Sequence, residues 1–99
     1  MSLLTTILAK LRAHEAQLRA RGVVHVAVFG SVVRSEHRDD SDVDLFVDLI
    51  PDVADDFFAY AGIAADLEQI VGQQVDVARR DRLRSHVRPS AEAQAVYAF

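Results

Sequence analysis

Apolar residues recur along the chain with two different periods, and these periods predict helices alternating with strands. From Ser2, which can cap a helix, to about Arg21, apolar residues recur every three or four positions. Gly22 then ends this helix, as glycine ends many helices. Residues 23–29, VVHVAVF, are apolar at nearly every position, which predicts a central strand covered on both faces. Residues 31–37 allow about two helical turns. The apolar face expected for the first helix consists of Leu4, Ile7, Leu8, Leu11 and Leu18.

The middle of the chain predicts a second strand and a long helix. Residues 42–49 alternate between apolar positions and a mostly acidic set, which is typical of a strand, and Pro51 ends it. Asp52 or Asp55 can cap a helix that runs to about Val71. The buried stripe expected for this helix consists of Phe57, Ala61, Ala64, Leu67 and Val71.

The last third of the chain predicts a short strand and a closing helix. Residues 73–79, QQVDVAR, are strand-like, and Pro89 suits the first turn of a helix. The side chains that can pack from this helix are Ala93, Val96 and Tyr97. The pattern as a whole predicts an α/β fold with a three-stranded sheet at its centre and room for a fourth short strand. A chain of 99 residues corresponds to one small domain, residues 1–99.

Composition and charge narrow the classes of function. The net charge of −4 argues against a protein that binds DNA or RNA through phosphate contacts. The charge is uneven, with nine acids between Glu36 and Asp56 and a run of arginines shortly before the C-terminus. We interpret the arginine run as solvated surface, with a bound anion or an acidic partner as the alternative. Its members are Arg79, Arg80, Arg82, Arg84 and Arg88.

The chain contains no cysteine, so it can form neither a disulfide nor a thiolate metal site. No apolar run approaches the length of a membrane span, and the N-terminus lacks the features of a signal peptide. We therefore expect a cytoplasmic protein without a membrane partner.

Carboxylates placed within the two later strands are the first candidate for chemistry. Asp42 and Asp44 are two residues apart, so they point to the same face of a strand and repel each other unless a cation lies between them. Mg²⁺ is suited to such a site, because it binds one or two carboxylates together with substrate phosphates and water. If the strand that carries Asp76 is a neighbour, three carboxylates converge in a layout suited to two-metal phosphoryl-type transfer. The alternatives are a turn role for Asp42 and a solvent-facing position for Asp44.

A Gly-Ser turn before these carboxylates is the second candidate. Gly30 and Ser31 follow a strand and open a helical segment, where free backbone N–H groups can bind an anion. Arg34, one turn later, can hold a phosphate through two hydrogen bonds. The glycine and lysine pattern of a P-loop and the three glycines of a dinucleotide-binding fingerprint are both absent.

The spacing of these two candidates, G-S-x10-D-x-D, resembles the signature of the nucleotidyltransferase superfamily that includes DNA polymerase β and kanamycin nucleotidyltransferase. The longer string FGSVVR…SDVDLFV is similar to the minimal nucleotidyltransferase (MNT) branch, and the resemblance covers nearly the whole chain. It implies the family's fold, a small mixed sheet of three to four strands flanked by helices.

The resemblance also implies a role for each matching residue. Gly30, Ser31 and Arg34 would hold the triphosphate of a nucleotide. Asp42 and Asp44 would bind Mg²⁺, and Asp76 would share a metal and help to deprotonate the attacking hydroxyl. The chain departs from the family at two positions: Ser35 stands where glycine is frequent, and Val33 where a small residue is common. Both departures could alter the turn after the phosphate site, and neither removes a metal ligand.

Many MNT proteins are antitoxins paired with a HEPN-domain toxin, which is a ribonuclease. The resemblance implies that such a protein transfers AMP from ATP to a tyrosine of the toxin and so blocks its RNase activity. The small size of the chain supports an acceptor supplied by a second chain. The alternatives are an antitoxin that neutralises the toxin by binding alone, and a stand-alone nucleotidyltransferase with a small-molecule acceptor.

Overall fold

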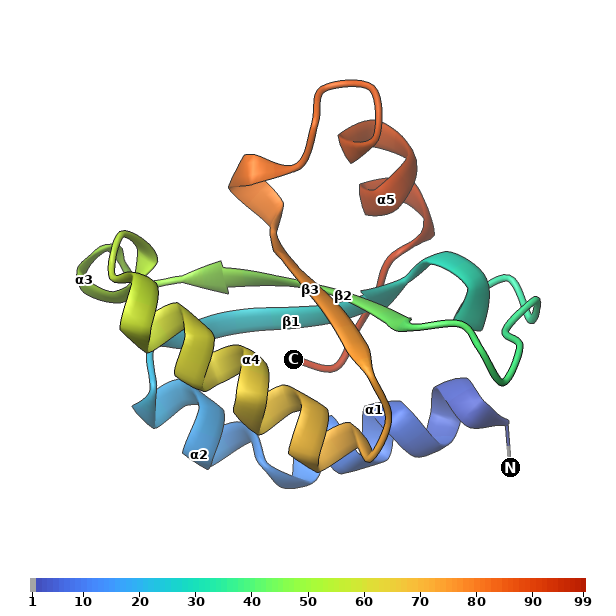
Figure 1. Cartoon of the computed structure of the whole chain (residues 1–99), viewed down its shortest axis with the longest axis horizontal. Coiled ribbons are helices and arrows are strands. Elements are labelled where there is room, and N and C mark those ends of the chain that lie inside the picture. Colours follow the sequence, from blue (N-terminus) through green and yellow to red (C-terminus); the bar gives the residue numbers. More distant parts are fainter. Residues whose placement is uncertain (1) are drawn as a thin grey trace.

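The computed structural model describes residues 2–99 as a twisted four-stranded sheet with helices on both of its faces (Figure 1). The strands are β1 (Val23–Phe29), β2 (Val43–Leu49), β3 (Val75–Arg79) and β4 (Val96–Tyr97). The α-helices are α1 (Leu3–Ala13), α2 (Glu15–Ala20), α3 (Pro51–Ala54), α4 (Phe57–Val71) and α5 (Arg88–Gln94). Two single 3-10 turns, η1 (Gly30–Val32) and η2 (Arg80–Arg82), follow β1 and β3.

The sheet has the order β3-β2-β1-β4 and is mixed. β1 pairs antiparallel with both β2 and β4, whereas β2 pairs parallel with β3. The parallel pair requires a long crossover, and α4 provides it. The expected α/β architecture with a fourth short strand is confirmed.

The main core lies between the sheet and the helices α1, α2 and α4, which gather on one side of it in Figure 1. Val43, Leu45 and Val47 of β2 point into this core and are almost fully buried. On the opposite face Phe46 is also fully buried, because Phe29 and Tyr97 pack against it under α5. The alternation predicted for residues 42–49 therefore positions the even-numbered side chains on the face that carries α5.

The first helix begins as predicted, with the hydroxyl of Ser2 accepting from the Thr5 backbone N–H at 3.1 Å. It is interrupted at His14, whose backbone leaves the helical region, so residues 3–20 form α1 and α2 instead of one helix. Leu18 of α2 is still fully buried, as expected.

The long helix differs more from its prediction. Its cap is Asp56, which accepts from the Ala59 backbone N–H at 3.1 Å, and neither Asp52 nor Asp55 takes this role. The buried stripe consists of Ile63, Leu67 and Val71, with Tyr60 and Ile70 packed partly against the core. Phe57 and Ala61 are exposed, and Ala64 is half-buried, because the larger side chains at 60 and 63 fill the core face instead.

The closing helix α5 is shorter than predicted. It ends at Gln94, and Val96 and Tyr97 leave it to pair with β1 as the fourth strand. Ala91 is the buried residue of this helix, whereas Ala93 is exposed. Across residues 2–99, no helix combines the length and apolar character needed to cross a membrane.

Candidate active site

The carboxylates predicted to converge are brought together by strand pairing. The parallel register places Asp44 of β2 directly beside Asp76 of β3. On its other side Asp44 is paired with Phe29, the last residue of β1. Asp42 is exposed and lies immediately before β2. The condition for convergence, that the D-x-D strand neighbours the strand of Asp76, is therefore met.

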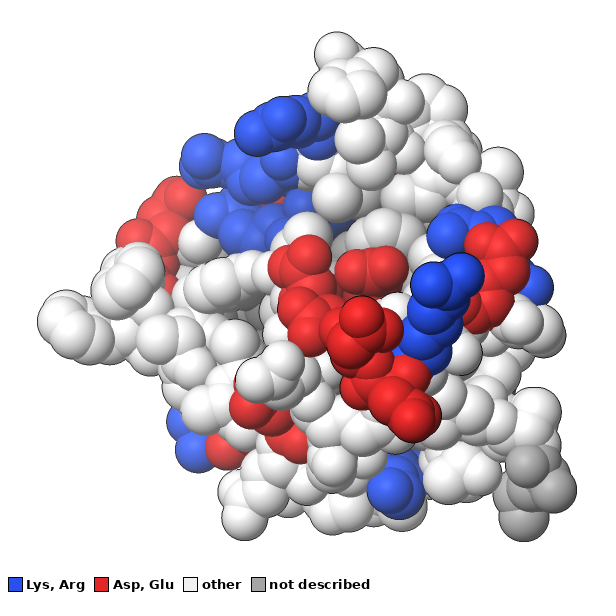
Figure 2. Space-filling view, turned by 45° about the vertical axis from the view of Figure 1, so that its right-hand side comes forward, with Lys and Arg blue, Asp and Glu red and all other residues white. Residues whose placement is uncertain are grey.

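Asp44 has the most perturbed environment of the three acids. Burial, followed by the charges of Asp76 and Asp42, raises the pKa of its carboxyl group above its ordinary value. Arg34 and His37 oppose this rise but do not cancel it. The site therefore carries negative charge that nearby cations do not fully compensate. Figure 2 shows Asp and Glu side chains gathered in the middle of one face, with Lys and Arg side chains on either side.

Gly30 lies against the carboxylate of Asp44. Its backbone has φ +77°, in the left-handed region, and a Cβ atom built there would collide with Oδ2 of Asp44. Glycine is thus required twice at this position, by backbone conformation and by space. The structure shows close approach of this backbone to a carboxylate, and its close approach to a phosphate stays a prediction.

Two adjoining hollows above these residues form a cleft between the sheet and the segment that leads into α5. Their volumes are about 330 and 390 Å³. Phe29, Asp44, His86 and Val87 line both of them. The first hollow is completed by Gly30, Arg34, Ser90, Ala91 and Gln94. The second is completed by Asp76, Ala78, Arg82, Leu83 and Arg84.

The residues predicted to bind the nucleotide differ in whether they line the cleft. Arg34 lines the first hollow and is held there by Glu36 at 3.0 Å and by the side-chain oxygen of Gln94 at 3.1 Å. Ser31 is half-buried and does not contribute to the lining of either hollow. The two helical turns predicted after Gly30 are reduced to the three-residue turn η1.

The two departures from the family pattern have different consequences. Ser35 has φ +59°, a left-handed conformation that glycine adopts at little cost and serine rarely adopts. The turn therefore keeps the conformation expected of glycine even though serine occupies it. Val33 is half-buried and packs against the main core.

Most of the arginine run is structural. Arg79 pairs with Asp81 at 2.8 Å, and Arg80 pairs with Asp48 of β2 at 2.8 Å and with Glu92 of α5 at 3.3 Å. Arg88 reaches the same Glu92 at 3.0 Å. Arg80 therefore links Asp48 of the sheet to Glu92 of α5 and gives Asp48 a structural role, whereas the Arg79 and Arg88 pairs are local.

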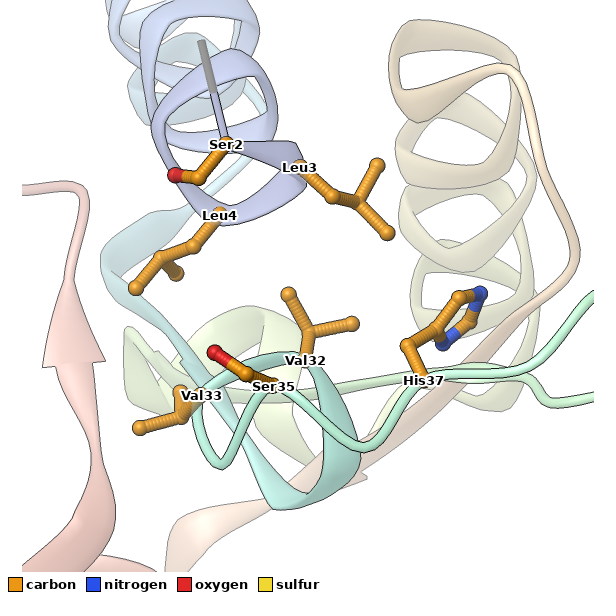
Figure 3. A pocket seen from close by; sticks show the side chains of 7 residues that line it. All are labelled: Ser2, Leu3, Leu4, Val32, Val33, Ser35 and His37. Atoms are coloured by element: carbon orange, nitrogen blue, oxygen red, sulfur yellow. The ribbon is translucent and has the colours of Figure 1, made fainter.

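A separate groove lies between the start of α1 and the loop after η1 (Figure 3). Leu3, Leu4 and Val32 make it largely apolar, and His37 closes one side. Nδ1 of His37 is buried and has no hydrogen-bond partner within residues 2–99. The groove contains none of the predicted site residues, so we do not count it as part of the active site.

The acids fit a hard divalent cation by donor type and by charge. Within the described residues 2–99, no three His, Asp or Glu side chains are arranged to enclose a metal ion by themselves. Mg²⁺ does not need such an enclosure, because phosphate oxygens and water normally complete its shell. Burial is the main cause of the raised pKa of Asp44, and the charges of Asp76 and Asp42 add to it; a bound cation would offset the contribution of these charges.

The sequence did not predict the residues that line the cleft on the side opposite the sheet, above all His86, Val87, Ser90 and Gln94. They precede or belong to α5 and reach Asp44 only through the folded chain. The sequence predicted a closing helix near Pro89 but gave no signal that this helix forms a wall of the cleft.

The comparisons with known proteins identify the family of the chain. The family model described as "Nucleotidyltransferase domain" matches residues 11–98. The protein adenylyltransferase MntA of Thermococcus cleftensis is 37% identical over 90 residues, which cover 88% of this chain and 87% of MntA. A solved minimal nucleotidyltransferase, provisionally so described, superposes with a TM-score of 0.78 at 32% identity, covering 97% of this chain and 95% of the other.

A toxin–antitoxin crystallised with AMP-PNP shares the fold, with a TM-score of 0.68 at 19% identity over 89% of this chain and 72% of the other. Family model, relative and fold agree with the resemblance carried by the G-S-x10-D-x-D spacing. The chain belongs to the nucleotidyltransferase domain family and is a nucleotidyltransferase.

Proposed function

We propose that this protein is an antitoxin that transfers AMP from ATP to a tyrosine hydroxyl of a partner HEPN-domain toxin and thereby neutralises its RNase activity. The observation that carries the proposal is the pairing of Asp44 with Asp76 beside Gly30, at the floor of an open cleft. Further support comes from the relative named MntA protein adenylyltransferase and from the toxin–antitoxin structure with AMP-PNP.

In this proposal the first hollow takes the nucleotide phosphates. Gly30 and Arg34 line it and can contribute donors to a triphosphate. Ser31 lies next to Gly30 but outside the lining, so its hydroxyl would contribute only if the turn η1 shifts when the nucleotide binds. Asp42, Asp44 and Asp76 would hold Mg²⁺. When bound, the cation would neutralise charge on the triphosphate and favour loss of the acceptor proton.

The chain's own groups then have defined tasks. The cleft positions the acceptor hydroxyl opposite the α-phosphorus, and the carboxylate of Asp76 accepts its proton. The acceptor oxygen forms a bond to the α-phosphorus while the bond to the β-phosphate bridging oxygen breaks, and pyrophosphate leaves. Arg34 stabilises the charge that accumulates on the leaving group.

A second chain supplies the acceptor in this proposal. The segment from η2 to α5 is the only part of residues 2–99 that stands over the open face of the sheet, and it carries no separate lobe for an acceptor. The acceptor hydroxyl therefore enters from outside. We place the reaction in the cytoplasm, where ATP and the RNA cleaved by such a toxin are found, and the net charge of −4 supports a protein rather than a nucleic acid as partner.

The test uses ATP labelled at its α-phosphate, Mg²⁺ and a purified HEPN-domain partner, with label and RNase activity measured in parallel. We expect label on a partner tyrosine and loss of RNase activity with the wild-type protein. Asp44→Asn should abolish both, whereas Asp40→Asn, which changes an exposed acid of the preceding loop, should retain both. Full neutralisation by Asp44→Asn without any label would contradict the proposal and show an antitoxin that acts by binding alone.

A further inference from the structure

The cleft has two ends that differ in their lining. Gly30 and Arg34 lie at one end, and Asp76, Arg82 and Arg84 lie at the other. Asp44 lines both hollows and therefore stands at their junction. If the nucleotide phosphates occupy the end with Gly30, the end with Asp76 is open to an acceptor that approaches Asp44.

Two arginines at this second end differ from the rest of the arginine run. Arg79, Arg80 and Arg88 are each engaged by a carboxylate at 3.3 Å or less. Arg82 reaches only Asp55, at 3.7 Å, and its side chain is 68% exposed. Arg84 is exposed and forms no ion pair with any residue in the described part of the chain. Both guanidinium groups are thus available to an anion that enters the second hollow.

The second hollow also has apolar lining residues. Ala78 of β3, Leu83 and Val87 line the same hollow, together with the ring of Phe29. Such a lining suits an aromatic ring, whose hydroxyl would then point towards Asp76 and Asp44. Asp44 and Asp76 repel an acceptor segment that carries acidic residues. Positive charges at the mouth of the hollow are therefore needed for such a segment to bind.

We propose that this end of the cleft is the acceptor subsite, and that Arg82 and Arg84 select a tyrosine flanked by acidic residues. This inference rests on the proposed function, since it names the acceptor chemistry of the same site. The tyrosine ring packs on Leu83 and Val87, and neighbouring Asp or Glu carboxylates pair with the two guanidinium groups. Exposed pairs of this kind contribute little individually, so the two together should give a preference on the order of tenfold.

The experiment measures binding separately from catalysis. Three fluorescent peptides with one central tyrosine, flanked by glutamates, serines or lysines, are titrated with the protein at low salt, and anisotropy gives each Kd. We expect the glutamate peptide to bind on the order of tenfold more tightly than the lysine peptide. The preference should weaken as salt is added, because salt screens exposed charges.

The decisive variant is R82Q/R84Q, and the charge-matched control is R19Q/R21Q, which removes two exposed arginines at the end of α2 on the other side of the sheet. Only R82Q/R84Q should lose the preference for glutamate, and neither variant should change the Kd of ATP. Equal binding of the three peptides by the wild-type protein, no binding of any, or a preference that survives in R82Q/R84Q would overturn the inference.

Two further outcomes separate the inference from the function on which it rests. If R82Q/R84Q weakens ATP binding instead, the arginines serve the donor phosphates and the inference is wrong. Label transfer from ATP to the peptides is measured alongside binding. If the protein prefers the glutamate peptide but transfers no label to peptide or partner, the proposed function is wrong and the acidic subsite remains supported. If label is transferred but the three peptides bind equally well, only the subsite is wrong.

Discussion

Replacing Gly30 with alanine should strain the backbone and displace the carboxylate of Asp44 at the same time. The same substitution at Gly72 serves as a control, because it should strain the backbone alone. Gly30 has φ +77° and Gly72, at the end of α4, has φ +78°. An alanine in this left-handed region costs about 1–2 kcal/mol at either position. The Cβ of Gly30→Ala would collide with Oδ2 of Asp44, whereas that of Gly72→Ala meets only Lys10 Nζ at 3.7 Å, an ordinary contact.

Both variants should therefore lose about 1–2 kcal/mol in urea unfolding, with a fall in Tm of about 4–8 °C for each kcal/mol. Gly30→Ala should lose somewhat more, because the carboxylate of Asp44 must move. Only Gly30→Ala should lose AMP transfer, measured with labelled ATP at a temperature where both variants are folded. If Gly30→Ala transfers AMP as fast as Gly72→Ala, the packing of Gly30 on Asp44 does not matter for the reaction.

Three other substitutions test the site and the core. Burial and the charges of Asp76 and Asp42 raise the pKa of Asp44 in the folded protein. Protonated Asp44 therefore contributes to the stability of the folded state at acidic pH, and this contribution is lost as pH rises through the raised pKa. Without divalent cations, Asp44→Asn should therefore have a higher Tm than the wild type at pH 7, and a smaller difference at acidic pH; a lower Tm at pH 7 would contradict this. Tyr60 donates to the backbone oxygen of Val77 at 2.7 Å, so Tyr60→Phe should cost about 0.5–1.5 kcal/mol in urea unfolding. Burial and the charge of Asp76 raise the pKa of Tyr60 from its ordinary value, so its phenolate absorbance should appear at higher pH than that of an unperturbed tyrosine. The stability that the neutral phenol contributes should be lost as pH rises through this raised pKa. Leu67→Ala, at a fully buried position, should cost about 2–5 kcal/mol.

The sequence predicted the strands of the sheet, and it predicted that Asp42 and Asp44 share one face, because both features follow from local patterns of residues. The alternation in residues 42–49 determines which side chains share the face of Asp44. The sequence left the strand order open, and the pairing of β2 with β3 places Asp76 beside Asp44. The family and the enzyme class are confirmed. The roles of the individual site residues, and the action of residues 1–99 as one independent domain, stay predictions.

The features that the sequence did not predict depend on contacts between distant segments. The buried stripe of α4 differs from the predicted one because alanines and larger apolar residues recur with similar periods along this helix. Only packing against the sheet selects Ile63 over Ala64 as the buried residue. Val96 and Tyr97 became a strand because β1 offered a free edge, which no local pattern reveals. The wall formed by His86 and Val87 shows neither a motif nor a period.

The central claim is that Asp42, Asp44 and Asp76 form one site for transfer from a cation-bound nucleotide. The most direct measurement compares the rates of AMP transfer, from ATP labelled at the α-phosphate to the HEPN partner, for the alanine variant of each acid and for the exposed control Asp40→Ala. We predict that Asp42→Ala, Asp44→Ala and Asp76→Ala each lose on the order of a hundredfold or more, whereas the control keeps the wild-type rate. Transfer at the wild-type rate by any of Asp42→Ala, Asp44→Ala and Asp76→Ala would contradict the claim.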